Sequence, residues 1–185
     1  NGVLLEEKDS ISKGVEAVYD AVVVIEGIKD NQLVSTGTGF VYKKSDGKAY
    51  IMTNHHVING VSSVKVVLSD GEIVDANIMG SEAYSDIAVL KIDKSKIIKV
   101  AELGDLNNSR VGDTVFAIGA PLDDEYSWTV TRGILSGKDR LVSASSTNSI
   151  NQDMVMSVMQ TDAAINSGNS GGALVDMDGN LIGIN

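Results

Sequence analysis

The chain has no cysteine, a single proline and only two histidines among its 185 residues. Without cysteine it can form no disulfide, no zinc–thiolate site and no iron–sulfur cluster, and cysteine usage gives no information on the redox compartment. The histidines are the neighbours His55 and His56. Their side chains point in different directions on a strand or a turn, so they make a poor chelating pair. We therefore expect no metal site.

Positive charge and long apolar runs are also scarce. Fifteen basic against 25 acidic residues give a net charge of −10, which repels phosphate backbones and argues against a nucleic-acid partner. No apolar run approaches the ~20 residues that span a bilayer, and the start of the chain lacks the regions of a signal peptide. Because the chain does not begin with Met, we expect either a processed product or a prepared fragment, from which any export signal or anchor has been removed.

The sequence is rich in short β-strand patterns. Helical spacing of apolar residues predicts one helix over Ser10–Asp20. Alternating or β-branched runs then predict about six strands: Val22–Ile25, Leu33–Tyr42, Tyr50–Asn54, Val64–Leu68, Ile73–Met79 and Ile87–Ile92. Asp, Asn and Gly between several of these runs tolerate the backbone angles of tight turns.

A polar stretch, Lys94–Arg110, resembles a linker and precedes a second series of strands. The series comprises Thr114–Ile118, Trp128–Leu135, Met154–Gln160, Ala173–Met177 and Leu181–Ile184, with a loop expected over Ser143–Gln152. Closely spaced strands with little helix favour antiparallel barrels or sandwiches. We predict an all-β protein with an N-terminal segment and helix over 1–20, a first small barrel over 21–98 and a second over 99–185.

The segment from Thr161 to Leu174 carries the strongest indication of chemistry. Its centre places Ser170 among glycines. Such glycines permit a tight turn that exposes the hydroxyl while neighbouring backbone N–H groups converge on one point, as an acyl-transfer nucleophile requires. A Gly/Ser/Asn cluster between strands is, however, more often only a loop.

A nucleophilic serine needs a base that is oriented by an acid. The histidine pair ends the third predicted strand, where a rigid element can hold a base, although a lone histidine there is more often structural. Asp86 stands just before an apolar strand. Burying its carboxylate would cost roughly several kcal/mol without a partner such as an imidazole N–H, and the alternative is a solvated turn aspartate.

The Gly-x-Ser-x-Gly pattern also occurs in the nucleophile elbow of α/β-hydrolases. In that fold the acid and then the histidine follow the serine, whereas here no histidine follows Ser170. The elbow also requires a helix after the serine, but the sequence predicts a strand and a hairpin there. The α/β-hydrolase fold is therefore excluded.

Three ordered motifs together resemble the HtrA (DegP/DegS) group of chymotrypsin-fold serine proteases. They are Thr53-Asn54-His55-His56-Val57, Ser85-Asp86-Ile87-Ala88-Val89-Leu90 and the run from Asp162 to Leu174, supported by Gly37-Thr38-Gly39-Phe40 and by Leu181-Ile182-Gly183-Ile184-Asn185. The resemblance extends from about the first helix to the last residue. It implies two antiparallel six-stranded β-barrels, of which the second is incomplete at its C-terminal end.

The resemblance also implies the roles of individual residues. His56, directly before the valine, would be the base, Asp86 the orienting acid and Ser170 the nucleophile, with the N–H groups of Gly168 and Ser170 as oxyanion hole. No cofactor is required. The substrate pocket would include Ala164, Ile165 and Asn166. Because Ala164 stands where trypsin-like enzymes carry an acid, the resemblance implies small aliphatic residues rather than Arg or Lys before the cut bond.

The chain ends at Asn185, where the family continues with a specificity loop, two strands, a helix and usually a PDZ domain. We therefore expect these 185 residues alone to cleave unfolded protein poorly. The implied function is an endopeptidase of protein quality control that acts on unfolded polypeptides in the cell envelope, with a homotrimer built through N-terminal residues and a membrane anchor as compatible features. The competing interpretation is an inactive module that holds extended peptides by strand addition.

Overall fold

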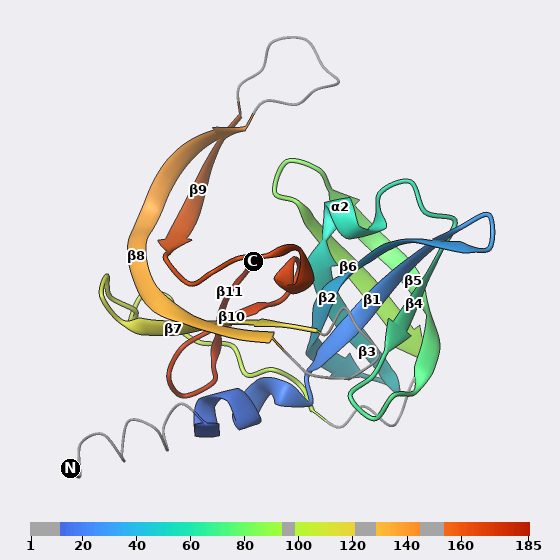
Figure 1. Ribbon diagram of the computed structural model, residues 1–185, viewed down its shortest axis with the longest axis horizontal. Helices are drawn as coiled ribbons and strands as arrows, with labels where there is room; N and C mark the ends of the chain where they lie inside the picture. The colour runs from blue at the N-terminus through green and yellow to red at the C-terminus, as the bar shows by residue number, and fades with distance from the viewer. Residues whose placement is uncertain (1–11, 94–98, 121–128, 145–153) are drawn as a thin grey trace.

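The computed structural model describes residues 12–93, 99–120, 129–144 and 154–185 (Figure 1). A helix over residues 12–19 leads into the first of two β units, which lie side by side. The predicted helix is confirmed over its described part. In the described residues, no helix has the length and apolar character needed to cross a membrane.

The first unit is a closed six-stranded barrel with strand order β1-β2-β3-β6-β5-β4. Its strands are β1 (Val22–Lys29), β2 (Gln32–Ser45), β3 (Lys48–Asn54), β4 (Ser63–Val67), β5 (Ile73–Glu82) and β6 (Ile87–Asp93). Pairing of β1 with β4 closes the barrel. Alternation produces the core: Ala88, Leu90 and Ile92 of β6 are buried while the residues between them are not. All six predicted strands are confirmed.

The second unit is a curled antiparallel sheet of five strands with the order β11-β10-β7-β8-β9. Its strands are β7 (Thr114–Gly119), β8 (Thr129–Ala144), β9 (Met154–Thr161), β10 (Ala173–Val175) and β11 (Leu181–Ile184). In the described part of the chain this sheet does not close, so β9 and β11 are edge strands. The second unit thus matches the expected incomplete barrel, with five strands rather than six.

A shared apolar core joins the two units and the helix. Val18 of the helix, Phe40 of β2 and Phe116 of β7 are fully or almost fully buried in one cluster. Burial of a side chain as large as phenylalanine contributes about 1.5–3 kcal/mol. This core fixes the middle of β2 against β7, and the candidate active site lies where these two strands meet.

Several predicted boundaries differ from the structure. The largest difference concerns β8, which the sequence predicts to end at Leu135, and β1 also continues past Ile25 to Lys29. The loop expected from Ser143 begins too early, because β8 continues to Ala144. The strand pairs with β9 through two register shifts, and Ser143 still faces Val155 across the ladder. Cross-strand pairing therefore overrides the low β-propensity of this polar stretch. The rest of that loop, part of the predicted linker and the start of the predicted helix lie outside the described residues.

Candidate active site

His56 lies in a single helical turn that follows β3. The turn, α2 (His55–Ile58), begins where the sequence predicted only a strand end. Val57 and Ile58 are buried and anchor the turn in the first barrel, whereas the His56 side chain is 56% exposed. The buried half of the turn thus fixes the backbone that carries an accessible imidazole.

Asp86 lies at the entrance to β6, in a tight turn. Its backbone is left-handed, with φ of +53°, a conformation that aspartate tolerates better than most residues. Its carbonyl accepts hydrogen bonds from the backbone N–H of His55 at 3.0 Å and from the side-chain amide of Asn54 at 2.9 Å. The turn that carries the acid is therefore attached directly to the segment that carries the base.

Glu82 organises the same turn. Its carboxylate accepts hydrogen bonds from the Tyr84 N–H at 3.0 Å, the Ser85 N–H at 2.7 Å and the Ser85 hydroxyl at 2.8 Å. The bond from the Tyr84 backbone, then those from Ser85 and the nearby charge of His55, hold the pKa of Glu82 below its ordinary value of 4.5. An ionised Glu82 therefore favours the turn that presents Asp86.

The Asp86 carboxylate contacts His56 at two nitrogen atoms. Its Oδ2 lies 2.7 Å from Nδ1 of the imidazole, and its Oδ1 accepts the His56 backbone N–H at 2.8 Å. An Nδ1–H that donates to Asp86 leaves Nε2 free to take up a proton. The expected partner of the Asp86 carboxylate, an imidazole, is present. The carboxylate is only partly buried, because the Asp86 side chain is 40% exposed.

Ser170 follows a 3₁₀ turn, η1 (Ser167–Asn169). The Asn169 N–H closes this turn on the Asn166 carbonyl at 3.0 Å. The Asn169 side chain is fully buried, accepts the Asn166 N–H at 2.9 Å and donates to the Ala164 carbonyl at 3.0 Å. A buried amide with both ends engaged thus holds the loop that presents the serine.

Glycines allow this loop to approach the first barrel. Gly171 has φ of +78°, and a Cβ there would lie 2.5 Å from the Thr53 hydroxyl and 3.1 Å from the Asn54 N atom. A Cβ on Gly172 would lie 2.1 Å from the Ile118 carbonyl oxygen. The expected tight glycine turn is present, and it brings Gly171, the residue after Ser170, against Thr53 and Asn54 at the end of β3, where the histidine turn begins.

The structure thus brings the three sequence motifs to one seam between the units. Asp86 and His56 are hydrogen-bonded, and the Ser170 carbonyl accepts the Thr38 N–H of β2 at 2.8 Å. Within the described residues, no hydrogen bond joins the Ser170 hydroxyl to His56. Such bonds are often long in ligand-free active sites and shorten when substrate binds.

The 3₁₀ turn also bears on the expected oxyanion hole. The Asn169 N–H points back to Asn166, so it is not available to a substrate oxygen. In a 3₁₀ turn each N–H donates to the carbonyl three residues earlier. The Ser170 N–H can therefore serve an oxyanion hole only if it does not donate to the carbonyl three residues earlier.

The three residues expected in the substrate pocket, Ala164, Ile165 and Asn166, are exposed neighbours on the approach to Ser170. The Ala164 carbonyl is fixed by the Thr131 hydroxyl at 2.8 Å, in addition to Asn169. The backbone of Ala164 and of Asn166 is thus held by hydrogen bonds, and the three exposed residues comprise one small, one apolar and one amide side chain. In the described ranges, no group of three or more His, Cys, Asp or Glu side chains is arranged to hold a metal ion.

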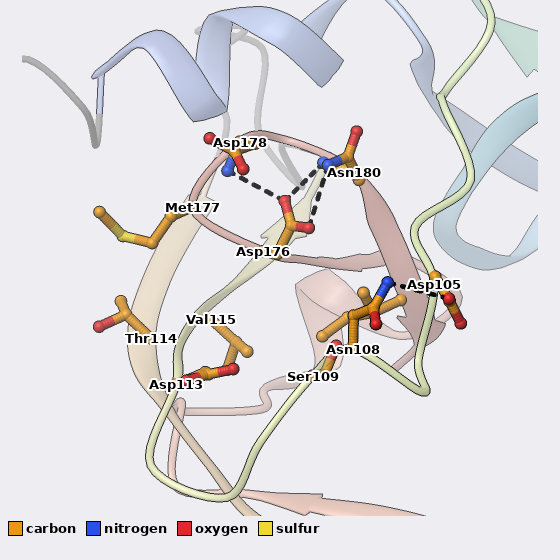
Figure 2. A pocket seen from close by; sticks show the side chains of 11 residues that line it. Asp105, Asn108, Ser109, Asp113, Thr114, Val115, Asp176, Met177, Asp178 and Asn180 are labelled. Carbon is orange, nitrogen blue, oxygen red and sulfur yellow. Dashed lines mark hydrogen bonds between the residues drawn. The ribbon is translucent and has the colours of Figure 1, made fainter.

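A separate cavity of about 420 Å³ lies on the second sheet and contains none of the three motif residues. It is lined by acidic side chains, including Asp105, Asp113, Asp176 and Asp178 (Figure 2). Asp176 accepts bonds from the backbone of Asp178 and Asn180, and Asp105 accepts the Asn108 side-chain amide (Figure 2). The carboxylates of Asp176 and Asp105 stabilise turns, so their presence at this cavity has a structural explanation.

Comparison with known proteins identifies the family of the chain. A family model described as a trypsin-like peptidase domain matches residues 37–184. The chain belongs to this peptidase family. The sequence is 51% identical over 196 residues to the Serine protease Do-like HtrA of Bacillus subtilis (strain 168) and 42% identical over 185 residues to that of Lactobacillus helveticus. Each alignment covers 97% of this chain and 43% of the relative, so the chain spans less than half the length of these relatives.

Solved structures give the same result. The serine endoprotease from Yersinia pestis is 35% identical, with a TM-score of 0.75 over 94% of this chain and 56% of that structure. An HtrA-type protease, AlgW with tripeptide, is 38% identical, with a TM-score of 0.74 over 94% of this chain and 53% of that structure. The resemblance to HtrA proteases, and with it the chymotrypsin-like fold class, is confirmed.

Two residues that shape the site received no role from the sequence, although Thr38 lies in the Gly37-Thr38-Gly39-Phe40 pattern. Glu82 and Thr38 each make several bonds to segments that carry a motif residue. Glu82 lies only four positions before Asp86, and a carboxylate so near can accept the N–H groups of the intervening turn, which is a local signal. The contacts of Thr38 with residues about 130 positions away have no local signal.

Proposed function

We propose that this chain is the catalytic domain of a serine endopeptidase in which Ser170, His56 and Asp86 act together. The observation that carries the proposal is the double contact between Asp86 and His56, at 2.7 Å and 2.8 Å, across a sequence separation of 30 residues. A solvated turn aspartate would be hydrated by water and would not bond to both the ring and the backbone of one histidine. This arrangement fixes the orientation of the imidazole.

In the proposed reaction, the Ser170 hydroxyl attacks the carbonyl carbon of a peptide bond while Nε2 of His56 takes its proton. His56 then protonates the leaving amine, and an acyl-enzyme remains on Ser170. Water, activated by the same imidazole, releases the acid product and restores the serine. The N–H groups of Gly168 and Ser170 would stabilise the oxyanion, and each hole donor contributes about 3 kcal/mol in enzymes of this kind.

The preference that we propose for the residue before the cut bond is small and aliphatic. Ala164 contributes no charge, and the adjacent Ile165 is 48% exposed and apolar. An Arg or Lys side chain would find no carboxylate at these positions. Unfolded polypeptides are the proposed substrates, because an extended chain is what the seam between two β units can accept.

The setting of the whole protein is also a proposal. The relatives are more than twice as long as the alignments with this chain, and we propose further domains, including a PDZ domain, outside these 185 residues. A cell-envelope location and a homotrimer are proposed on the family resemblance alone.

A peptide-binding module is the second candidate. It is favoured by the edge of β9, which in the described residues offers backbone groups for strand addition. The edge of β11 is partly covered, because Leu181 donates to the Glu102 carbonyl and accepts from the Gly104 N–H.

Cleavage and binding measured side by side separate the two functions. The assay compares the whole natural protein with Ser170→Ala and His56→Ala, using unfolded casein and a fluorogenic peptide. The peptidase proposal predicts that both variants lose cleavage while Ser170→Ala still binds casein with wild-type affinity. Undiminished cleavage by Ser170→Ala would refute it. Tight binding without cleavage by the wild type would support the binding module instead.

A further inference from the structure

Thr38 occupies an unusual position in β2. Thr38 is fully buried, and its hydroxyl donates to the Gly168 carbonyl at 2.9 Å and accepts the Ala120 N–H at 2.7 Å. Its backbone N–H donates to the Ser170 carbonyl at 2.8 Å. One residue of the first barrel therefore contacts the nucleophile loop at two carbonyls and the end of β7 at an amide.

We propose that Thr38 is a positioning residue that holds the nucleophile loop in its working orientation. The inference rests on the proposed function, because it assigns Thr38 a role in presenting Ser170 and the Gly168 N–H. Fixing the carbonyl of Gly168 limits rotation about the glycine whose N–H would serve the oxyanion hole. Fixing the carbonyl of Ser170 limits rotation on the other side of the nucleophile.

The loop needs such support because glycines make it adjustable. Gly168, Gly171 and Gly172 lie within two residues of Ser170, and glycine restricts backbone angles less than any other residue. A loop of this kind can keep Ser170 near His56 while losing the alignment of its N–H groups. A misplacement of about 1 Å in an active site can cost 10²-fold in rate.

Thr38 is itself held firmly. Its carbonyl accepts the Thr53 hydroxyl at 2.6 Å, and Thr53 is also fully buried. The flanking Gly37 lets the strand approach closely, since a Cβ there would lie 2.6 Å from the Val57 side chain and 3.3 Å from the Ser170 carbonyl oxygen. The positioning residue therefore stands on a strand that is packed against both the histidine turn and the nucleophile loop.

The hydroxyl performs two tasks at once, donation to Gly168 and acceptance from Ala120, so the choice of substitution is informative. Valine has the shape of threonine but can do neither, whereas serine can do both. We expect Thr38→Val to lower kcat about 10- to 100-fold with little change in KM, because the loss concerns alignment in the transition state. Thr38→Ser should stay within about threefold of the wild type, because it keeps both bonds.

Thr161→Val is the matched control. The Thr161 hydroxyl also donates one bond, to the Ile134 carbonyl at 2.9 Å, and accepts one, from the Ala163 N–H at 3.1 Å. Neither partner belongs to the turn η1 or to Ser170. Thr161 begins the segment that leads to Ser170 and is only partly buried, whereas Thr38 is fully buried. The control loses the same number and kind of bonds, but its partners lie outside residues 167–172, and we expect kcat to stay within about threefold of the wild type.

The experiment measures kcat and KM on a fluorogenic peptide, and hydrogen exchange at the Ala120 and Asn169 amides, in the wild type and the three variants of the whole protein. The inference predicts loss of kcat in Thr38→Val only, together with exchange at Ala120 at least about tenfold faster. Full activity of Thr38→Val, an equal loss in Thr38→Ser, or an equal loss in Thr161→Val would overturn it.

Failure of the proposed function looks different. If Ser170→Ala cleaved as well as the wild type, the serine mechanism would be wrong whatever Thr38 does. If the wild type did not cleave at all, the inference would be judged on exchange at the Asn169 amide, which closes the turn η1 on the Asn166 carbonyl at 3.0 Å. Unchanged protection there in Thr38→Val would refute the positioning contact, and faster exchange there, absent in Thr161→Val, would support it.

Discussion

Replacing Asp86 with asparagine tests the two contacts of Asp86 with His56, with almost no change in the shape of the side chain. The asparagine oxygen can still accept the His56 backbone N–H, as Oδ1 of Asp86 does at 2.8 Å. Its amide nitrogen then faces Nδ1, which lies 2.7 Å from Oδ2 in the native site. Since two donors cannot share a hydrogen bond, the ring must carry its proton on Nε2, where it can no longer accept the proton of Ser170.

The expected loss of activity is large and the expected loss of stability is small. The wrong tautomer lowers kcat about 10⁴-fold in enzymes with this arrangement, equivalent to about 5.5 kcal/mol of transition-state stabilisation. The side chains of His56 and Asp86 are 56% and 40% exposed, so solvent screens their interaction. We expect a stability change below about 1 kcal/mol and hence a change in Tm of less than about 4 °C.

The assay combines kcat/KM on a fluorogenic peptide with thermal unfolding. Asp70→Asn serves as control, because Asp70 is also an exposed turn aspartate of the first barrel and accepts one backbone N–H, that of Glu72, at 3.0 Å. The reasoning is refuted if Asp86→Asn keeps kcat/KM within tenfold of the wild type. It is also refuted if Asp70→Asn loses as much activity.

Three further predictions concern other parts of the site. Gly171→Ala should abolish cleavage and lower Tm, because a Cβ there would lie 2.5 Å from the Thr53 hydroxyl at a left-handed φ of +78°; wild-type kinetics would contradict this. Glu82→Gln should be less stable than the wild type at neutral pH, and the gap should close as the pH falls below 4.5, because a lowered pKa makes the contribution of the ionised form disappear on protonation; a gap in unfolding free energy that is constant from pH 7 to pH 3 would show the reasoning to be wrong. A peptide panel should show faster cleavage after Val or Ala than after Arg or Lys, since Ala164 supplies no charge, and a basic preference would overturn that assignment.

The β-strands could be predicted well because their signals are local. Every predicted strand has a counterpart in the structure, since alternation of buried and exposed residues in runs such as β6 is written directly in the sequence. The predicted strand ends are wrong where pairing with a neighbouring strand determines how far a strand extends. β8 continues past Leu135 to Ala144 because β9 pairs with it, and the partner strand begins ten residues after β8 ends.

The candidate site could be predicted as a set of motifs but not as a geometry. The histidine was expected at a strand end, whereas the chain turns into α2 after Asn54. That turn depends on contacts with the Asp86 segment, 30 residues away, and these contacts cannot be derived from local patterns. The contact of Thr38 with Gly168 depends on how the two β units pack, so it too was visible only in the structure.

The central claim is that Ser170 is activated by His56, and a fluorophosphonate probe tests it most directly. The probe forms a covalent adduct only with an activated serine, and mass spectrometry of the digested protein identifies the modified residue. The account predicts one adduct, on Ser170, that disappears in Ser170→Ala and falls at least about 10³-fold in rate in His56→Ala. An adduct on another serine, or labelling of Ser170 at an unchanged rate in His56→Ala, would contradict it.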